Sequence, residues 1–352
     1  MLRGDSTNGA NHTTAIFQRG YSTVLSVTFQ RRLAHRLWPG APIRAGLVAT
    51  LLLASWPVLV NASLLGLLPS AAIRSLGSWG WLLLFSLLNF GMLASAWFGW
   101  RLLATQAGPA LDTFLRDSPD KSRLIDLWLQ GRMSARLQTL VAAGGAGLAL
   151  ASFHLISHEL SDHLEVAIPS YLMVAWTGAI GASVNYCAAT IAELPIRLYR
   201  CRRPRLVWHS PSTTPAIVAG CDGYRFEAMA MLLGVTATEL IAILAPGKDE
   251  TPFLHVMSVA FPIAAVLWVF CVVIQPFVAM HLLVRRERRH ALDSIERELQ
   301  YLSKESPQYE RQRNAYADLT ASPLLPINSA TVVEYSAVLL GLLGAYLVPR
   351  FL

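Results

Sequence analysis

Long apolar stretches recur along the chain, and polar segments that carry most of the charges separate them. A membrane-spanning helix needs about 20 predominantly apolar residues. Six stretches come close to or exceed that length, and a seventh is free of charge for fifteen residues. They cover residues 45–68, 79–100, 137–156, 166–192, 228–245, 252–284 and 335–349. The pattern predicts an all-α integral membrane protein, a polytopic bundle of six to seven transmembrane helices with cytoplasmic helical extensions.

The same pattern divides the chain into four parts. Residues 1–44 form a basic N-terminal segment, and residues 45–285 form a transmembrane bundle of three helical hairpins. Residues 286–330 form a cytoplasmic amphipathic helix and a linker, and residues 331–352 form a C-terminal membrane helix.

Small residues mark the third and fourth spans. Side chains of this size, four positions apart, let membrane helices approach closely. These two spans are therefore expected to be the tightest pair of helices. The small residues concerned are Gly144, Gly145, Gly147 and Ala151 in the third span and Gly178, Gly181, Ala182 and Ser183 in the fourth.

Prolines are expected inside three of the predicted spans, at Pro57, Pro262 and Pro276. A membrane helix tolerates proline where a neighbouring helix satisfies the backbone carbonyl that the missing N–H leaves free. No cysteine falls in a predicted external loop, so a disulfide framework is not expected.

Composition and charge agree with a lipid environment. The chain is 54% hydrophobic and 14% charged, whereas soluble domains carry about 25% charged residues. With the N-terminus inside, 26 of the 29 basic residues lie in cytoplasmic segments, as Lys and Arg normally do. Topology thus explains the net charge of +7 without a nucleic-acid partner. The bacterial cytoplasmic membrane is the expected location. Because the basic first segment resembles a transit peptide, the mitochondrial inner membrane is the alternative.

The stretch SFHLISHELSDHLE, residues 152–165, lies at the external end of the third span. On a helix, His154, His158 and Asp162 are successive i, i+4 neighbours. Imidazole and carboxylate groups on one face are ligands for divalent transition metals. The spacing predicts a metal site, with a divalent ion as the candidate cofactor. The alternative is that polar residues at a helix end simply face water.

Glu239 falls near the middle of the fifth predicted span. A carboxylate there costs about 2.5–3.5 kcal/mol on insertion scales, so such a residue usually faces a cavity or a partner. Asn185 and Tyr186 in the fourth span could supply hydrogen bonds. These three residues predict an ion-coupling site. A protonated Glu239 that makes an interhelical hydrogen bond is the equally supported alternative.

A polar helix is expected to continue beyond the sixth span. Four apolar residues recur along one of its faces at the 3–4–3 spacing that is typical of a short coiled coil. They are Leu292, Ile295, Leu299 and Leu302. This seam predicts either contact with neighbouring cytoplasmic segments of the same chain or a surface for oligomer or partner binding.

Two functions from different classes follow. The first is a small-cation or metal transporter or channel with an intramembrane carboxylate. The alternative is a non-catalytic membrane scaffold, sensor or effector that acts through its cytoplasmic helices. The expected partners are the lipid bilayer and either a second copy of the chain or a cytoplasmic protein. An enzyme is the least supported class, because HELSDH at residues 158–163 lacks the H-E-x-x-H spacing of zinc proteases and no complete catalytic set is visible.

Overall fold

The computed structural model describes residues 36, 42–65, 76–102, 127–159, 167–200, 217–226, 229, 267–268 and 270–324. Within these residues the only regular secondary structure is helical; short turns join the helices, and there is no strand. The seventh predicted span, nearly all of the fifth and about half of the sixth lie outside them, as does Glu239. The all-helical class is confirmed for the described part, whereas the number of spans stays a prediction.

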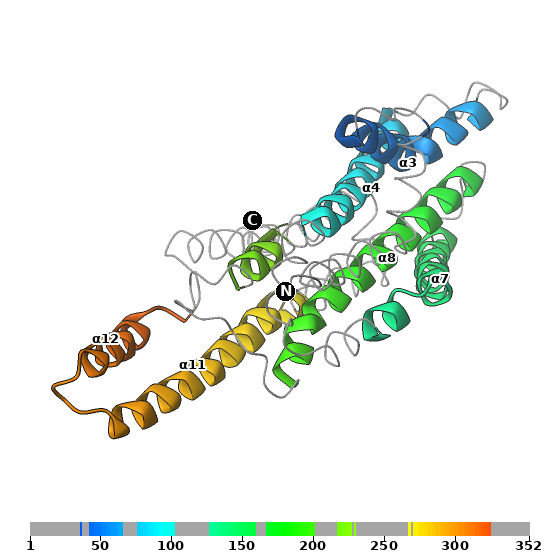
Figure 1. Cartoon of the computed structure of the whole chain (residues 1–352). Coiled ribbons are helices and arrows are strands. Elements are labelled where there is room, and N and C mark those ends of the chain that lie inside the picture. The colour runs from blue at the N-terminus through cyan, green and yellow to red at the C-terminus, as the bar shows by residue number, and fades with distance from the viewer. Residues whose placement is uncertain are drawn as a thin grey trace, which may run out of the picture.

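Four long helices correspond to the first four predicted spans. They are α3 (Pro42–Leu65), α4 (Leu76–Leu102), α7 (Ala135–Glu159) and α8 (Ala167–Arg200). Helix α8 is the hub of the fold, because it contacts α3, α4 and α7 as well as the later helices η4 (Phe270–Ile274) and α11 (Gln275–Tyr301). In Figure 1, α3 and α4 lie at one end of the molecule, and α11 and α12 (Pro307–Ala321) lie at the other.

Among the described residues, two helices are long and apolar enough to cross a membrane, over Ala135–Leu155 in α7 and Tyr171–Arg200 in α8. Only 6% of the first span is buried. Its exposed leucines, Leu140, Leu148 and Leu155, recur at intervals of eight and seven residues and thus share one face. A core helix of a soluble protein would hide such a face, so α7 favours a membrane protein. Shorter apolar stretches occupy Gly46–Trp56 in α3 and Phe85–Gly99 in α4.

Among the helices that the structure describes, α7 and α8 make the most extensive contact. A Cβ atom placed on Gly145 would lie 2.5 Å from the carbonyl oxygen of Gly178, and one on Gly178 would lie 2.6 Å from that of Gly145. The two backbones therefore touch where neither residue has a side chain. The expected tight pair is confirmed at Gly145, Gly178 and Ala182, but Gly144 and Gly147 are exposed and do not contribute.

Two prolines inside helices are each matched by an aromatic donor from another helix. Pro57 cannot donate to the carbonyl of Leu53, four residues earlier, and the indole N–H of Trp176 donates to that oxygen at 3.0 Å. Pro195 likewise frees the carbonyl of Ile191, which accepts from the hydroxyl of Tyr224 at 3.2 Å. This supply of donors explains why both helices continue through proline.

Helix α8 therefore runs to Arg200, eight residues beyond the predicted end of the fourth span. The helix at residues 217–226, which carries Tyr224, packs against this extension and against α11. All three of these helices carry buried apolar side chains. They include Leu194, Leu198, Ile217, Met280, Leu283 and Val284.

Helix α11 begins after a π-helical turn, η4, and carries Pro276 within its first turn. Because Pro276 has no N–H, it cannot bond to the carbonyl of Val272, and π-turns are a common way for a helix to absorb such a break. The helix then continues without interruption to Tyr301. This confirms the expected polar helix beyond the sixth span.

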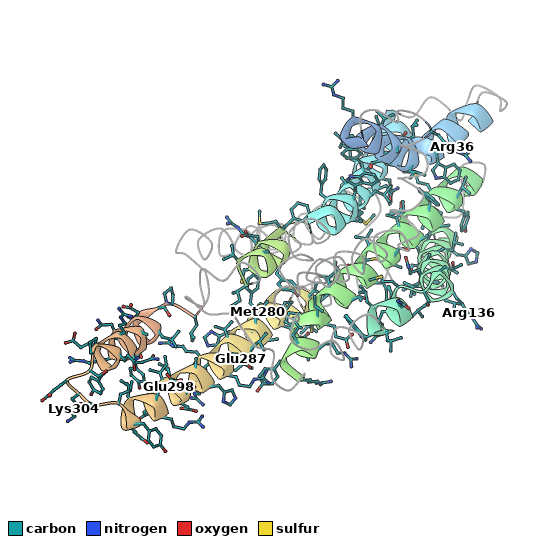
Figure 2. The ribbon with its side chains drawn as sticks, in the orientation of Figure 1. Arg36, Arg136, Met280, Glu287, Glu298 and Lys304 are labelled. Carbon is teal, nitrogen blue, oxygen red and sulfur yellow. The ribbon has the colours of Figure 1, made fainter. Side chains whose placement is uncertain are left out.

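Helix α12 was not expected; the sequence indicated only a linker there. It begins at Pro307 after Ser306, whose hydroxyl accepts from the backbone N–H of Gln308 at 3.1 Å. Helices α11 and α12 form a hairpin, with Lys304 at its tip (Figure 2). Half-buried or buried residues on α12 are Tyr309, Gln312, Tyr316 and Leu319.

The predicted seam of α11 lies on the side of the helix that faces α12. All four seam residues, Leu292, Ile295, Leu299 and Leu302, are half-buried. Arg288, which is on the same face, donates to carbonyls of α12. The half-burial of these residues and the bonds of Arg288 indicate that the seam faces α12. Its role, contact within the chain or a surface for oligomer or partner binding, stays a prediction.

Candidate functional site

Near the C-terminal end of α7, His154 joins this helix to α8. Its Nδ1 atom lies 2.9 Å from the hydroxyl oxygen of Tyr171, and the ring of Phe153 packs edge-on against Tyr171. His158 is part of α7, but its side chain lies outside the described residues, and so does Asp162. Among the side chains described, no three His, Cys, Asp or Glu residues come together. The metal site remains a prediction that the described residues do not test.

Asn185 and Tyr186 are held by different neighbours. The side-chain amide of Asn185 donates to the carbonyl of Gly181 at 2.8 Å, and its oxygen accepts from the indole N–H of Trp268 at 3.0 Å. The Tyr186 hydroxyl donates to the carbonyl of Arg132 at 2.8 Å. Each of these two side chains ties α8 to another helix. Because Glu239 lies outside the described residues, the predicted ion-coupling site stays a prediction.

A cluster of charges lies at the opposite end of the α7–α8 pair. Glu193 accepts from Arg132 at 3.1 Å and forms an ion pair with Arg197 at 2.7 Å. The guanidinium of Arg197 lies 5.6 Å from the ring centre of Trp128. Since these side chains are partly exposed, each ion pair contributes about 1 kcal/mol or less. Together with Tyr186 they hold the helix at residues 127–132 against α8.

A polar group that sequence reasoning did not single out lies in the interior of the bundle. Asn89, at the middle of α4, is fully buried, and its amide donates to the hydroxyl of Thr177 on α8 at 3.1 Å. Its oxygen, and the hydroxyl of Ser86 one turn away, have no partner among the described residues. An Asn in the middle of an apolar stretch was the signal that could have indicated it, because such residues usually bond across helices.

The lone hydroxyl of Ser86 is unusual for this bundle. Most other small polar side chains of the spans donate to the backbone carbonyl four residues earlier, which satisfies them within their own helix. The residues that do so are Thr50, Ser55, Ser95, Thr139, Ser183, Asn185 and Thr190. Ser86 and Asn89 are the exceptions that face the interior.

Where α11 leaves the bundle, Arg286 holds the end of α8. One of its N–H groups donates to the carbonyl of Tyr199 at 2.6 Å, and its guanidinium lies 4.9 Å from the ring centre of the same residue. Glu287, which is buried, forms an ion pair with Arg286 at 3.0 Å. The last carbonyls of a helix lack intrahelical donors and carry partial negative charge, so a cation there is stabilising.

Arg288 does the same for the end of α12. It donates to the carbonyls of Thr320 and Ser322, which lie at the last turn and the C-cap of that helix. Residues two apart on a helix point about 200° from each other. Arg286 and Arg288 therefore reach different helices from opposite flanks of α11. We call these two residues the arginine clasp.

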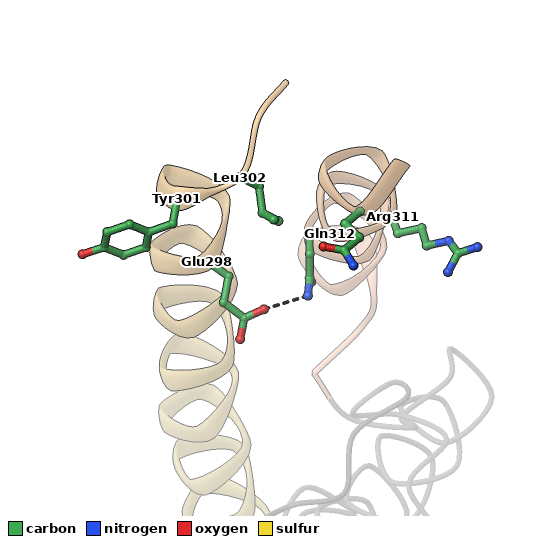
Figure 3. Close-up of a pocket in the computed structure, with 6 residues that line it drawn as sticks. Glu298, Tyr301, Leu302, Arg311 and Gln312 are labelled. Atoms are coloured by element: carbon green, nitrogen blue, oxygen red, sulfur yellow. Dashed lines mark hydrogen bonds between the residues drawn. The ribbon is translucent and has the colours of Figure 1, made fainter. Parts of the chain in front are cut away.

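Farther out, the hairpin contains an open hollow of about 530 Å³ lined by Glu298, Tyr301, Leu302, Gln308, Arg311 and Gln312. The amide of Gln312 donates to the carboxylate of Glu298 at 2.7 Å across it. Figure 3 shows Leu302 between the two helices, while Tyr301 points away from α12. The hollow is thus a gap between the helix ends, bridged by one hydrogen bond.

Comparison with known proteins yields no match. No protein-family model, no curated protein and no solved structure is similar to the chain.

Proposed function

We propose that the chain is a multi-pass membrane protein that acts as a non-catalytic scaffold or effector, by presenting the α11–α12 hairpin to a cytoplasmic protein or to a second copy of itself. The observation that carries this proposal is the arginine clasp. Through Arg286 and Arg288, α11 holds the C-terminal ends of both α8 and α12. A hairpin fixed in this way would keep a defined orientation relative to the membrane.

The outer face of the hairpin is suited to a protein partner. Tyr301 is 88% exposed at the end of α11, and aromatic residues are enriched in protein interfaces. Around it lie exposed charges of both signs, including Arg297, Glu298 and Arg311. A surface with charges of both signs favours one complementary partner in one orientation over non-specific binding.

We further propose the bacterial cytoplasmic membrane, with the N-terminus and the hairpin inside. The exposed apolar face of α7 and the basic composition of the intervening segments support this placement. A cysteine introduced at Arg313 should react with a membrane-impermeant maleimide only after the membrane is opened. Reaction in intact cells would reverse the orientation.

Site-specific photo-crosslinking tests the scaffold proposal. A photoreactive phenylalanine at Tyr301 should give a discrete protein adduct in cells, whereas the same group at Leu299, on the face toward α12, should not. Arg288→Gln, which releases α12, should weaken the adduct. Absence of an adduct at Tyr301 and at other exposed positions of the hairpin would contradict the proposal.

Small-cation transport is the second candidate, and the interior polar atoms of Ser86 and Asn89 are the observation that favours it. Buried oxygen atoms without a hydrogen-bond partner inside a helix bundle could bind a small cation transiently as it crosses. Transport would require Glu239 and should tolerate loss of the hairpin. Flux into liposomes that is abolished by Glu239→Gln but not by deletion of residues 303–324 would favour transport over the scaffold.

A further inference from the structure

One face of α11 changes character along its length. Ile274, Val278 and Leu282 are exposed apolar residues on this face. Arg285 and Arg289 continue it one and two turns later, and Asp293 and Glu296 follow; all four are exposed. At 100° per residue, all seven positions fall within about 60° of a common direction. The order along the face is thus apolar, then cationic, then acidic.

The opposite face is buried against the bundle. Ala279, Met280, Leu283, Val284 and Glu287 lie on it. The exposed face therefore points away from the described helices that pack against α11. Apolar side chains that face outward along a membrane helix contact acyl chains, and the first charges beyond them lie at the level of the lipid headgroups.

The four arginines at this level divide into two pairs. Arg286 and Arg288 are engaged with helix ends, as described above. Arg285 and Arg289 are exposed, and neither makes an ion pair with a carboxylate of the described residues. They are i, i+4 neighbours, so their guanidinium groups lie on adjacent turns of one face.

We propose that Arg285 and Arg289 bind the phosphate of an anionic phospholipid in the cytoplasmic leaflet, with the acyl chains of that lipid against Ile274, Val278 and Leu282. A guanidinium group matches phosphate oxygens in a bidentate geometry that lysine cannot reproduce. Asp293 and Glu296, farther along the same face, mark the end of this phosphate site, because their carboxylates would repel a phosphate. This inference rests on the membrane placement in the proposed function.

The test uses the full chain purified in an uncharged maltoside detergent. Thermal unfolding is followed by tryptophan fluorescence during titration with phosphatidylglycerol, phosphatidylcholine or inorganic phosphate. The test variant is Arg285→Gln/Arg289→Gln. The matched control is Arg311→Gln/Arg313→Gln, which removes the same charge from exposed positions of α12.

Phosphatidylglycerol should raise the Tm of the wild type and of the control at lower concentration than phosphatidylcholine does. Since each juxtamembrane arginine is worth about fivefold in affinity for anionic lipid, the test variant should need about 25-fold more phosphatidylglycerol for the same shift. The effect should weaken as salt is added.

Equal responses of the two double variants would overturn the inference, and so would an equal effect of inorganic phosphate alone. A chain that stays folded and dispersed without detergent would instead overturn the membrane placement itself. Failure of the lipid site and failure of the proposed function are thus distinguishable.

Discussion

Arg286 on α11 donates to the backbone carbonyl of Tyr199 on α8 at 2.6 Å, and its guanidinium also covers the ring of that tyrosine. Two positions later, Arg288 makes the corresponding contacts with the end of α12. One short segment thus satisfies the terminal carbonyls of two helices that are far apart in the sequence. Hydrogen bonds from charged groups contribute about 1.5–3 kcal/mol each, so this segment is where the bundle and the hairpin are joined.

The glycine contact between α7 and α8 predicts a contrast between adjacent residues. Gly145→Ala would place a methyl group against the carbonyl of Gly178 and should lower the free energy of unfolding by about 1–3 kcal/mol. Gly144→Ala meets nothing within 4 Å and should be neutral or slightly stabilising. Thermal unfolding in detergent measures both. A similar Tm for the two variants would mean that the helices are not in backbone contact there.

The proline at position 57 and the indole of Trp176 should be energetically coupled. Trp176→Phe leaves the Leu53 carbonyl without a donor and should cost about 1–3 kcal/mol. In a Pro57→Ala background, the restored N–H at position 57 can donate to that carbonyl. The same Trp176→Phe change should then cost less, by about 1 kcal/mol. Additive effects in this double-mutant cycle would show that the indole does not compensate for the proline.

Asn89 and Thr177 should respond to substitution in opposite directions. Asn89→Leu removes an unpaired buried oxygen, a gain of about 1–3 kcal/mol. It also removes one interhelical hydrogen bond, which is worth about 0.6 kcal/mol in membranes. The net effect should be a higher Tm. Thr177→Val leaves the whole Asn89 amide without its partner and should lower the Tm. Destabilisation by Asn89→Leu would indicate that a polar species normally pairs with Asn89.

The thiol of Cys221 should be unreactive near neutral pH. Burial, assisted by the neighbouring charge of Asp222, raises its pKa from 9.0 to about 12. Near pH 8 the folded protein should therefore hold about a thousandfold less thiolate at this position than the unfolded chain does. Alkylation by iodoacetamide, followed by peptide mass spectrometry, should modify Cys221 only after denaturation.

The raised pKa of Cys221 also makes the stability of the fold depend on pH. Because the folded-state pKa is the higher one, the contribution of Cys221 is fully present below pH 9 and is lost as the pH rises toward 12. Cys221→Ala should flatten this part of the profile. Rapid alkylation of the folded protein at pH 8 would contradict the assigned burial.

Much of the helical framework could be predicted from apolar periodicity and length. The first four spans begin within three residues of α3, α4, α7 and α8. The end of α8 could not be predicted, because Pro195 is a helix breaker until Tyr224 supplies a donor from 29 residues away in the sequence. Tertiary contacts of this kind are invisible to a local pattern.

Helix α12 was missed for a different reason. Its sequence, PQYERQRNAYADLTA, is polar on nearly every side, and Leu319 is its only buried residue. The available signal was the pair Ser306 and Pro307, a favourable N-cap followed by proline in the first turn. The arginine clasp could not be predicted either. The sequence places four arginines within five residues, and only the tertiary structure shows which of them contact helix ends. Asn185 and Tyr186 were predicted to join Glu239 in an ion-coupling site, which the described residues do not test. Adjacent positions on a helix point about 100° apart, and each of the two side chains contacts a different helix.

The most direct test of the account is a distance between the bundle and the hairpin. Spin labels at exposed positions, Arg136→Cys on α7 and Ala317→Cys on α12, would be attached in a background without the native cysteines. In liposomes, pulsed electron paramagnetic resonance should give one narrow distance distribution. Arg286→Gln/Arg288→Gln should broaden it, whereas Arg285→Gln/Arg289→Gln should leave it narrow. A broad distribution in the unsubstituted chain, or no change in the clasp variant, would contradict the claim that the clasp fixes the hairpin to the bundle.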